Sequence, residues 1–518
     1  MNYPVWNVFF GSGPLIAMVA ILHVFVSHFA VGGGLFLVLT ERKARRDKDL
    51  PLLGWLKSHT KFFVLATVVW GAVSGVGIWL TIGLINPTAT SNLIHAFVWG
   101  WAIEWVFFFL EITAALLYFY GWDKLDPRLH QWYGWIYFIS AYASLLIING
   151  ILTFMLTSGK WVENHQFWTG FFNPTYLPAT AFRTLIAMAL AGVYALITAS
   201  RQKDTALKTR IVRWSVRWIV PSLLLLPAAG WWYIHQIPTD LWASARGPMP
   251  TATHFALLAV ALFASAFALS LVAAIKPARL HIAFSLVVAL VALGAMGSFE
   301  FVREAIRKPY VIGNYLYANS LYSTGTSGDA GFNVDAVSQV GVLQSAHWVE
   351  TRQITSDNKA EAGREIFVLE CSSCHTPDNY RGLSQFLTRR NWTHDRTSAI
   401  ISALDLLHNG VMPPFAGTDA ERDALATYLD TVHPVKENGA VDGQTVFDRN
   451  CSVCHRFKSG EEIFPGLPDD SKSAADLLKD MPAIFPRMPD LKLTDDERIA
   501  LVQWIAARRH ATANTGGR

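Results

Sequence analysis

Charged residues are scarce in this chain. Only 16% of its 518 residues are Asp, Glu, Lys or Arg, whereas 52% are hydrophobic and 13% are aromatic. Soluble domains usually carry about 25% charged residues, so the composition argues against a wholly soluble protein. The net charge is also small, +4 at pH 7, which lacks the strongly basic balance of a nucleic-acid-binding protein. We therefore expect the chain to have the lipid bilayer as a partner and to bind no nucleic acid.

Cysteine is scarcer still, and it is unevenly placed. The chain has four cysteines, and none lies in residues 1–310, which hold 17 of the 20 tryptophans. Residues 311–518 hold all four cysteines and most of the acidic residues. This asymmetry predicts two halves in two solvents, the first in lipid and the second in water.

The first half contains eight apolar stretches, each long enough to cross a bilayer core, which takes about 20 helical residues. They run over residues 14–39, 61–85, 93–119, 134–157, 177–199, 215–235, 253–275 and 280–303. The connections between them are short. The pattern predicts an all-α protein in which residues 1–315 form an eight-helix transmembrane bundle.

The loops of this bundle differ sharply in charge. The loops after helices 1, 3, 5 and 7 carry 16 Lys and Arg residues, whereas the three opposite loops carry two, Lys160 and Arg246. Basic loops stay on the cytoplasmic side, so we expect the N-terminus outside and, with an even number of helices, residue 310 outside as well. No basic region precedes the first apolar stretch, so no cleavable signal peptide is expected and helix 1 is expected to remain as an anchor.

Two C-x-x-C-H motifs contain all four cysteines: Cys371-Ser-Ser-Cys374-His375 and Cys451-Ser-Val-Cys454-His455. This spacing is the attachment signature of haem c. The two thiols bond the two vinyl groups of one macrocycle, and the adjacent histidine reaches the iron. A C-x-x-C pair can also hold half of a zinc site. Here each pair has its own histidine and a later methionine, which favours two covalent haem c groups.

Methionines in Pro-rich loops supply candidate sixth ligands. Met412 and Met488 follow their histidines by 37 and 33 residues, and thioether ligation raises the haem potential. Met481 is a weaker rival to Met488. The pattern resembles tandem class I cytochrome c domains, at 358–435 and 436–518, after a linker at 316–357 that is a tether or a surface lobe. Haem c is attached on the outer side of the bacterial inner membrane, so these domains are expected in the periplasm.

Ionisable residues inside the membrane half are the next candidates, because charges in lipid are costly and usually functional. They are His23, His28, Glu104, Glu111, Arg183, Glu300, Arg303, Glu304 and Arg307, with His235 and His254 flanking one outer loop. Each has an ordinary alternative: a buried histidine is often only hydrogen-bonded, an arginine at a helix end can reach the interface, and Glu304 with Arg307 can be a simple i, i+3 pair. Taken together, histidine and carboxylate near one membrane face favour iron-porphyrin ligation, and the glutamate pair favours proton delivery.

Three segments carry a resemblance to a known family. The run Glu304-Ala-Ile-Arg307-Lys-Pro-Tyr-Val-Ile-Gly313 resembles the E-x-x-R-Q-P-W-x-I-G signature of cytochrome bd-type oxygen reductase subunit I. The segment with Glu104, Glu111 and Gly-Trp-Asp-Lys124 is similar to the third helix of that family, and the segment around His23 resembles its first helix. The resemblance covers about residues 10–315.

The resemblance implies roles for these residues. It implies that His23 is an axial ligand of one high-spin haem and that Glu304 is a ligand of a neighbouring one. Glu104 and Glu111 would belong to the haem environment and the proton path, and Arg307 would pair with a propionate. It further implies two or three non-covalent haems, of type b with type d as the alternative at the active site, and a second membrane subunit similar to subunit II of the family.

The departures from the family are equally informative. Where the family has the helix 5 histidine of a low-spin haem b, this chain reads Phe182-Arg183-Thr184, and the helix 7 methionine position is near Ala256. That haem site is either absent or rebuilt with His254, His235 or His95; Arg183 and His254 are predicted to bind cofactor. The long outer quinol loop is also missing, and only residues 236–252 stand in its place. These changes predict the branch fused to cytochrome c, in which electrons enter through the c haems.

The predicted function is that of a membrane-bound terminal oxidase subunit. Electrons would pass from a periplasmic cytochrome c through the two c haems to a high-spin haem, where dioxygen is reduced to water. Three alternatives remain open at this point: oxidation of a quinol with export of electrons through the c haems, reduction of nitric oxide at the same iron, and a non-catalytic electron conduit.

Pigment analysis tests the central expectation. Extraction of the purified protein with acidified organic solvent is expected to release non-covalent haem while two haem c groups per chain stay bound, because thioether bonds resist extraction. Spectra of the extract and of the residual protein measure both. If the extract contains no haem at all, the membrane half is only an anchor.

Overall fold

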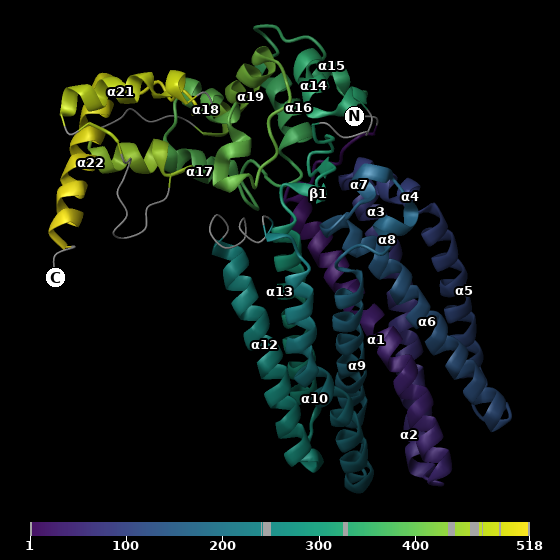
Figure 1. The fold of residues 1–518 in the computed structure, drawn as a ribbon. Coiled ribbons are helices and arrows are strands. Elements are labelled where there is room, and N and C mark those ends of the chain that lie inside the picture. The colour runs from purple at the N-terminus through teal and green to yellow at the C-terminus, as the bar shows by residue number, and fades with distance from the viewer. Residues whose placement is uncertain are drawn as a thin grey trace. The chain divides into compact units, whose positions relative to one another are not determined.

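The computed structural model describes residues 3–239, 241, 250–324, 330–433, 441–455, 466–468, 470–485 and 488–515 (Figure 1). The chain divides into two compact units. One holds Leu15–Arg307 and Val311–Asn314, and the other holds Met1–Pro14, Lys308–Tyr310 and Tyr315–Arg518. Across the described residues, the regular structure is helical apart from two short strands, β1 (Tyr310–Ile312) and β2 (Leu316–Tyr317). The prediction of an all-α protein is confirmed.

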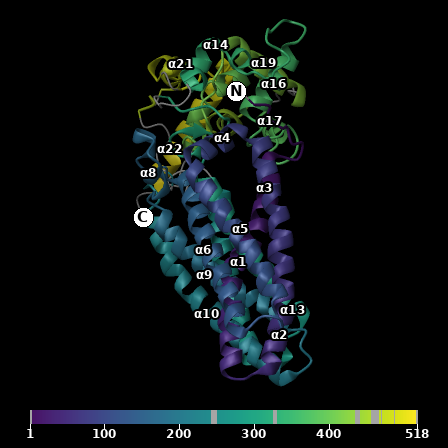
Figure 2. The same cartoon turned by 90° about the vertical axis from the view of Figure 1, so that its right-hand side faces the viewer.

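The first unit contains the membrane helices. Eight described helices are long and apolar enough to cross a bilayer, as predicted. They are α1 (Ser12–Arg46), the continuous run of α2 (Leu50–Val64), η1 (Leu65–Gly71) and α3 (Ala72–Ile85), then α5 (Val98–Tyr120), α6 (Pro127–Leu156), α9 (Tyr176–Ala199), α10 (Thr205–His235), α12 (Pro250–Ile275) and α13 (Ile282–Ile306). Figure 2 shows them as one elongated bundle. Short helices α4 (Pro87–Ala96), α7 (Trp161–Asn164) and α8 (Phe167–Phe171) connect them.

Two boundaries differ from the sequence prediction. The first two predicted spans leave residues 40–60 as a loop, and this prediction is wrong in extent. The helix α1 continues to Arg46 and α2 begins at Leu50. Asp49 caps α2 by accepting a hydrogen bond from the Leu52 amide. Basic residues in the last turn of α1 suit the negative end of its dipole. The expected single span 93–119 is broken at Phe97, whose buried ring packs on Phe154. Hydrophobicity is continuous across that break, so composition could not reveal it.

Small residues bring the membrane helices close together, as is usual in lipid. A Cβ added to Gly32 of α1 would lie 1.9 Å from the carbonyl oxygen of Ala187 in α9. A Cβ added to Gly192 of α9 would lie 2.5 Å from the carbonyl oxygen of Ser215 in α10. These backbones touch directly, which fixes the positions of α1, α9 and α10.

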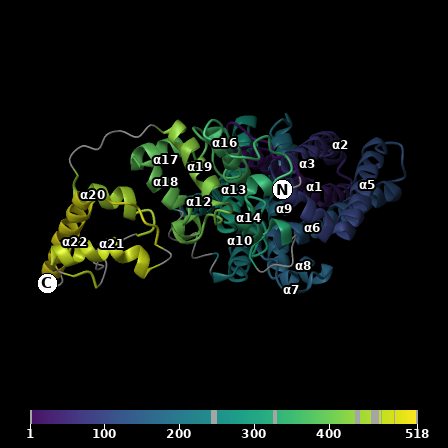
Figure 3. The same ribbon diagram turned by 90° about the horizontal axis from the view of Figure 1, so that it is seen from above.

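The second unit contains two helical modules. The first is built from α16 (Lys359–Glu370), α17 (Leu383–Arg390), α18 (His394–Ile401), η4 (Leu404–Asn409) and α19 (Asp419–Val432), and the second from α20 (Gly443–Val446), η5 (Phe447–Cys451), α21 (Ser471–Ile484) and α22 (Asp495–Thr515). Figure 3 shows α20, α21 and α22 grouped beside the first module. The expected boundary between residues 435 and 436 lies outside the described residues.

Both modules use the same packing contact. A Cβ on Gly363 would lie 2.0 Å from the carbonyl oxygen of Ala424, and a Cβ on Gly443 would lie 2.0 Å from that of Ala500. Each glycine lies eight residues before the first cysteine of its C-x-x-C-H motif. The helix that carries each motif is therefore held directly against the last helix of its module.

Part of the expected linker is folded. After the short helix η3 (Ala330–Phe332), the chain forms α14 (Val334–Val340) and α15 (Val342–Ser345). Val337, Val342 and Leu343 join the hydrophobic core of the first module. The buried carboxylate of Glu421 accepts hydrogen bonds from the amides of Val342 and Leu343, at 3.0 and 2.8 Å. These residues therefore match the predicted surface lobe and not the predicted tether.

The helix contact at Gly32 yields a stability prediction. Gly32→Ala is expected to destabilise the membrane unit by about 1–3 kcal/mol, because the added methyl group forces the backbones of α1 and α9 apart. The matched control is Gly54→Ala in α2, where no atom lies within 4 Å of the added methyl group, and a gain of about 0.5–1 kcal/mol is expected. Thermal unfolding in detergent measures both, and equal unfolding temperatures would contradict the close approach.

Candidate functional site

His23 lies in α1 against the second membrane span. Its Nδ1 lies 3.1 Å from Ser74 Oγ, and the Ser74 hydroxyl donates to the carbonyl oxygen of Trp70 at 2.7 Å. When the hydroxyl proton points to this carbonyl, Ser74 Oγ can accept from His23 Nδ1–H, and in that tautomer the lone pair lies on Nε2. Proteins fix metal-binding histidines in this way. The wide π-type turn η1, which ends at Gly71, precedes Ser74, and such turns often occur at functional sites.

The space beside His23 is kept open by glycine. A Cβ on Gly75 would lie 3.2 Å from the His23 ring, so a larger side chain there would press on the imidazole. The imidazole, its hydroxyl partner and the neighbouring glycine fit a histidine that holds a haem iron through Nε2.

The two glutamates of α5 both face α6. Glu104 accepts a hydrogen bond from Ser144 at 2.8 Å, and Glu111 accepts one from Tyr137 at 3.1 Å. Their separation of seven residues is about 10 Å along the helix axis. The structure therefore places them on one face, as the sequence predicts, and supplies Ser144 and Tyr137 as partners that the sequence did not identify.

The end of α13 presents a carboxylate and an arginine with spare donors. Glu304 is 43% exposed at its side chain and lies 2.5 Å from Arg307 Nη2. Arg307 is buried, and its Nε and Nη1 have no hydrogen-bond acceptor among the described residues. Buried guanidinium donors without acceptors fit an anionic group such as a haem propionate. For Glu304 to hold an iron, its carboxylate would have to share or leave the contact with Arg307.

Arg183 belongs to a buried ionic cluster. Its Nη2 lies 3.4 Å from Glu300 Oε1, and Arg303 Nε donates to Glu300 Oε2 at 2.7 Å. His28 lines a small cavity beside this pair, and Phe182 stacks on Phe299 with ring centroids 4.6 Å apart. The helix 5 position where the family has a haem-binding histidine is thus occupied by an arginine that is neutralised by α13.

The candidates for a rebuilt low-spin site are bound locally or exposed. His95 Nδ1 lies 2.8 Å from the carbonyl oxygen of Ser91, and His235 Nδ1 lies 2.8 Å from that of Trp231. His254 is exposed near the start of α12. Arg246 and the rest of 242–249 lie outside the described residues. A haem ligand role for His95, His235 or His254 stays a prediction.

The sequence analysis missed a buried acid at the other end of α1. Glu41 is fully buried and accepts from Arg45 Nε at 2.7 Å and from the Tyr118 hydroxyl at 2.9 Å, and it lies 2.9 Å from His130 Nδ1. His130 Nε2 lies 2.9 Å from the carbonyl oxygen of Tyr118. A carbonyl only accepts, so Nε2 donates, and one further proton must lie between Nδ1 and Glu41. Because residues 40–60 were predicted to be a loop, the sequence did not identify Glu41 as the buried partner of His130.

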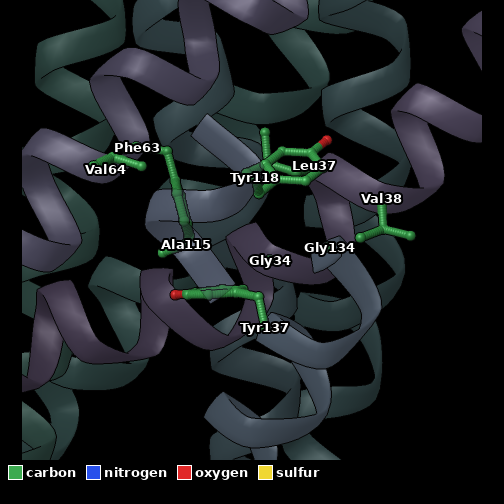
Figure 4. Close-up of a pocket in the computed structure, with 9 residues that line it drawn as sticks. All are labelled: Gly34, Leu37, Val38, Phe63, Val64, Ala115, Tyr118, Gly134 and Tyr137. Atoms are coloured by element: carbon green, nitrogen blue, oxygen red, sulfur yellow. The ribbon is translucent and has the colours of Figure 1, made fainter. Parts of the chain in front are cut away.

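A small cavity lies between this pair and Glu111. Figure 4 shows its lining, which comes from α1, α2, α5 and α6. Tyr118, bonded to Glu41, lines one part of it, and Tyr137, bonded to Glu111, lines another. Each carboxylate thus has a tyrosine partner, and the two tyrosine rings border the same small apolar cavity.

The two C-x-x-C-H motifs have the same backbone turn. The amides of Cys374 and His375 donate to the carbonyl oxygen of Cys371 at 3.0 and 2.9 Å, and those of Cys454 and His455 donate to that of Cys451 at 3.1 and 2.8 Å. None of the four cysteines, all of which lie in the described residues, forms a disulfide. Each motif therefore has the thiols that two thioether bonds to one haem require.

Burial sets the protonation states at these motifs. It raises the pKa of Cys371, raises the pKa of Cys451 to about 12, and lowers the pKa of His455. The imidazole is then neutral, which is the form that binds a metal. His375 Nδ1 lies 3.0 Å from the carbonyl oxygen of Arg381, a contact that orients an iron-binding histidine.

The methionines lie in different settings. Met412 packs against the core of the first module, Met488 lies in the loop after α21, and Met481 lies within α21 and packs against the core of the second module. The loop position of Met488 suits a sixth ligand better than the core position of Met481. Both assignments stay predictions.

Comparison with known proteins agrees with these observations. The family model described as cytochrome bd terminal oxidase subunit I matches residues 14–237, and the model described as cytochrome C oxidase, cbb3-type, subunit III matches residues 358–429 and 438–505. The membrane part is thus similar to cytochrome bd subunit I over residues 14–237, and the C-terminal part is similar to cytochrome c domains over two successive stretches. The chain is thus a multi-pass membrane oxidoreductase of electron transport, and the predicted resemblance is confirmed.

A solved structure has the same membrane fold. The bd oxidase from Geobacillus thermodenitrificans is 15% identical, with a TM-score of 0.53 over 59% of this chain and 89% of that chain. At this identity the likeness concerns the fold alone. No match is found among curated proteins.

The ionic cluster at Arg183 gives a second stability prediction. Glu300→Gln is expected to lower the free energy of unfolding by about 3–5 kcal/mol, because Arg183 and Arg303 would lose their shared buried counter-charge. Asp47→Asn is the control, since its pairs with Lys43 and Arg46 are exposed and should contribute little. Thermal unfolding measures both, and an unchanged E300Q variant would show that the cluster carries no net stabilisation.

Proposed function

We propose that this protein is the membrane-bound terminal oxidase subunit that reduces dioxygen to water with electrons from a periplasmic cytochrome c. The observation that carries the proposal is His23, an imidazole whose Nδ1 contacts Ser74 Oγ and whose Nε2 is then available to an iron, in a bundle similar to cytochrome bd subunit I. Two cytochrome c domains on the same chain supply the matching route for electrons.

The residues that would hold the haems follow from the site. His23 and Glu304 would ligate the high-spin haem irons, and Arg307 would bind a propionate through its spare donors. The c haems would be attached through the four motif cysteines and ligated axially by His375, Met412, His455 and Met488. Bound in this way, the haems supply one-electron redox chemistry and an open iron position for dioxygen.

The protons would come through side chains of the bundle. The Glu41–His130 pair lies at one end of α1, and Tyr118 and Tyr137, which donate to Glu41 and Glu111, border the same small cavity. Glu104, bonded to Ser144, lies about 10 Å from Glu111 along α5. This placement of proton acceptors supports a path from the Glu41 end toward the haems, in which protons would cross the cavity between the two tyrosines.

The orientation proposed for the chain is N-terminus outside and C-terminus outside, in a bacterial inner membrane. The 16 to 2 distribution of basic loop residues supports it. Electrons from the periplasm and protons from the cytoplasm would then meet in the membrane, which moves charge worth about 2.3 kcal/mol per unit charge per 100 mV.

The proposed partners are lipid, a periplasmic cytochrome c and a second membrane subunit similar to subunit II of the family. Large apolar side chains on α3 and α5 are exposed in this single chain, and Trp79, Leu80, Trp99, Trp105 and Phe109 are among them. Such a surface needs a cover of lipid or of another membrane protein.

Substitution of His23 tests the proposal. His23→Ala is expected to diminish the carbon monoxide-induced spectral shift of the purified protein and to abolish its oxygen uptake with reduced cytochrome c, because one high-spin iron loses its ligand while the haem assigned to Glu304 keeps its own. Covalent haem c content should not change. The control is His281→Asn, which keeps a side-chain cap on α13 far along the chain from every proposed ligand.

The same preparation separates the competing functions. Oxygen uptake with reduced cytochrome c supports the proposal, whereas nitrous oxide produced from nitric oxide without oxygen uptake supports the nitric oxide reductase. Reduction of the c haems by quinol supports electron export. Absence of any carbon monoxide shift in the unmodified protein would leave only an electron conduit.

A further inference from the structure

The two cytochrome c domains meet through one segment of the first domain. We call residues 383–396, which include α17 and the start of α18, the bridge segment. Its Trp392 is 2% exposed, and the indole Nε1 donates to the carbonyl oxygen of Arg449 at 2.8 Å. Its Arg390 donates through Nη1 to Ser452 Oγ at 2.8 Å and also to the carbonyl oxygen of Asp448.

A buried ion pair fixes the same contact. Arg396 of the bridge segment pairs with Glu497 of the second domain, and their side chains are 4% and 5% exposed. Arg396 Nε also donates to the carbonyl oxygen of Leu491 at 3.1 Å. The ion pair and the hydrogen bonds of Arg396, Trp392 and Arg390 together fix the relative position of the two domains within this unit.

The contact includes the second haem-attachment motif itself. Ser452 and Val453 are the two residues between Cys451 and Cys454, and Val453 is buried in the hydrophobic core of the first domain. The thioether bonds to Cys451 and Cys454 would place the attached edge of the second haem next to these residues. A haem attached there would therefore have this edge beside the bridge segment.

The first attachment motif borders the same core. Cys371 and Met412, the attachment residue and candidate axial ligand of the first haem, pack against the cluster that contains Trp392 and Val453. One continuous set of buried side chains thus extends from the first haem site to the second. No comparable contact would be needed if the second domain were only tethered.

We propose that the bridge segment is the electron-transfer contact between the two c haems, with Trp392 and Arg390 as positioning residues. The inference rests on the proposed function in that the c haems carry electrons. In the step, one ferrous haem c loses an electron and becomes ferric while the other gains it and becomes ferrous, and no proton or bond changes. The Arg390 guanidinium beside the second motif also favours the less positive, reduced form of the second haem, which raises its potential.

The test uses the full-length protein under anaerobic conditions. Redox titration resolves the two c-haem midpoint potentials, and laser-flash reduction by a soluble flavin radical resolves electron equilibration between the haems. Arg390→Met is expected to lower one midpoint potential and leave the other in place, whereas Arg390→Lys keeps the charge and should restore much of that potential. Trp392→Phe is expected to slow equilibration about tenfold, because donor and acceptor are held less rigidly.

Arg389→Met is the matched control. Arg389 is the neighbouring, exposed arginine of the same helix, so its loss changes the net charge equally without touching the second motif. Covalent haem content must remain two per chain in each variant, which shows that attachment and folding survive. If R390M and R389M shift the potentials equally, or if W392F and unmodified protein equilibrate at the same rate, the bridge segment only docks the domains and the inference fails.

This outcome is separate from the oxidase proposal. Both measurements use only the c haems without oxygen, so they can succeed in a protein that reduces no dioxygen. Conversely, oxygen uptake that continues with unchanged inter-haem behaviour in both variants would overturn the bridge and leave the proposed function intact.

Discussion

Charge burial is the constraint on which this structure depends. A charged side chain in lipid or in a protein core is tolerated only with a partner, and each part of the protein meets that demand between distant segments. Glu300 pairs with Arg183 and Arg303 in the membrane bundle, Glu41 is shared by Arg45, His130 and Tyr118, and Glu497 pairs with Arg396 across the two cytochrome c domains. These contacts fix which helices are neighbours.

The two cytochrome c domains of the second unit share the same helix contact and the same helix cap. Each domain places a glycine eight residues before its first cysteine against the last helix, and each last helix begins with a Thr and a Glu that cap it. The Glu in each pair also binds the preceding part of the chain: Glu421 binds the folded lobe at Val342 and Leu343, and Glu497 binds the first domain at Arg396. One repeated carboxylate therefore joins successive modules.

Sequence reasoning succeeded where a local pattern has one physical meaning. Eight runs of apolar residues can only be satisfied as helices in lipid, and two C-x-x-C-H motifs define attachment sites without knowledge of the fold. It failed at α4 and α5, where the hydrophobic run continues through the break at Phe97, and at α1, where basic residues continue the helix beyond the apolar stretch. In both cases the pattern of polar and apolar residues does not show where the helix begins or ends.

The sequence by itself determined the two solvents of the chain, the eight spans, the all-α class, and the haem c motifs, because composition and spacing act over short stretches. Only the tertiary structure decided which charges are paired. Residues 183 and 300, 41 and 130, and 396 and 497 lie 89 to 117 positions apart, and no local pattern connects them. Their pairing depends on which helix faces lie together, and that is settled by packing of the whole bundle and of the two domains.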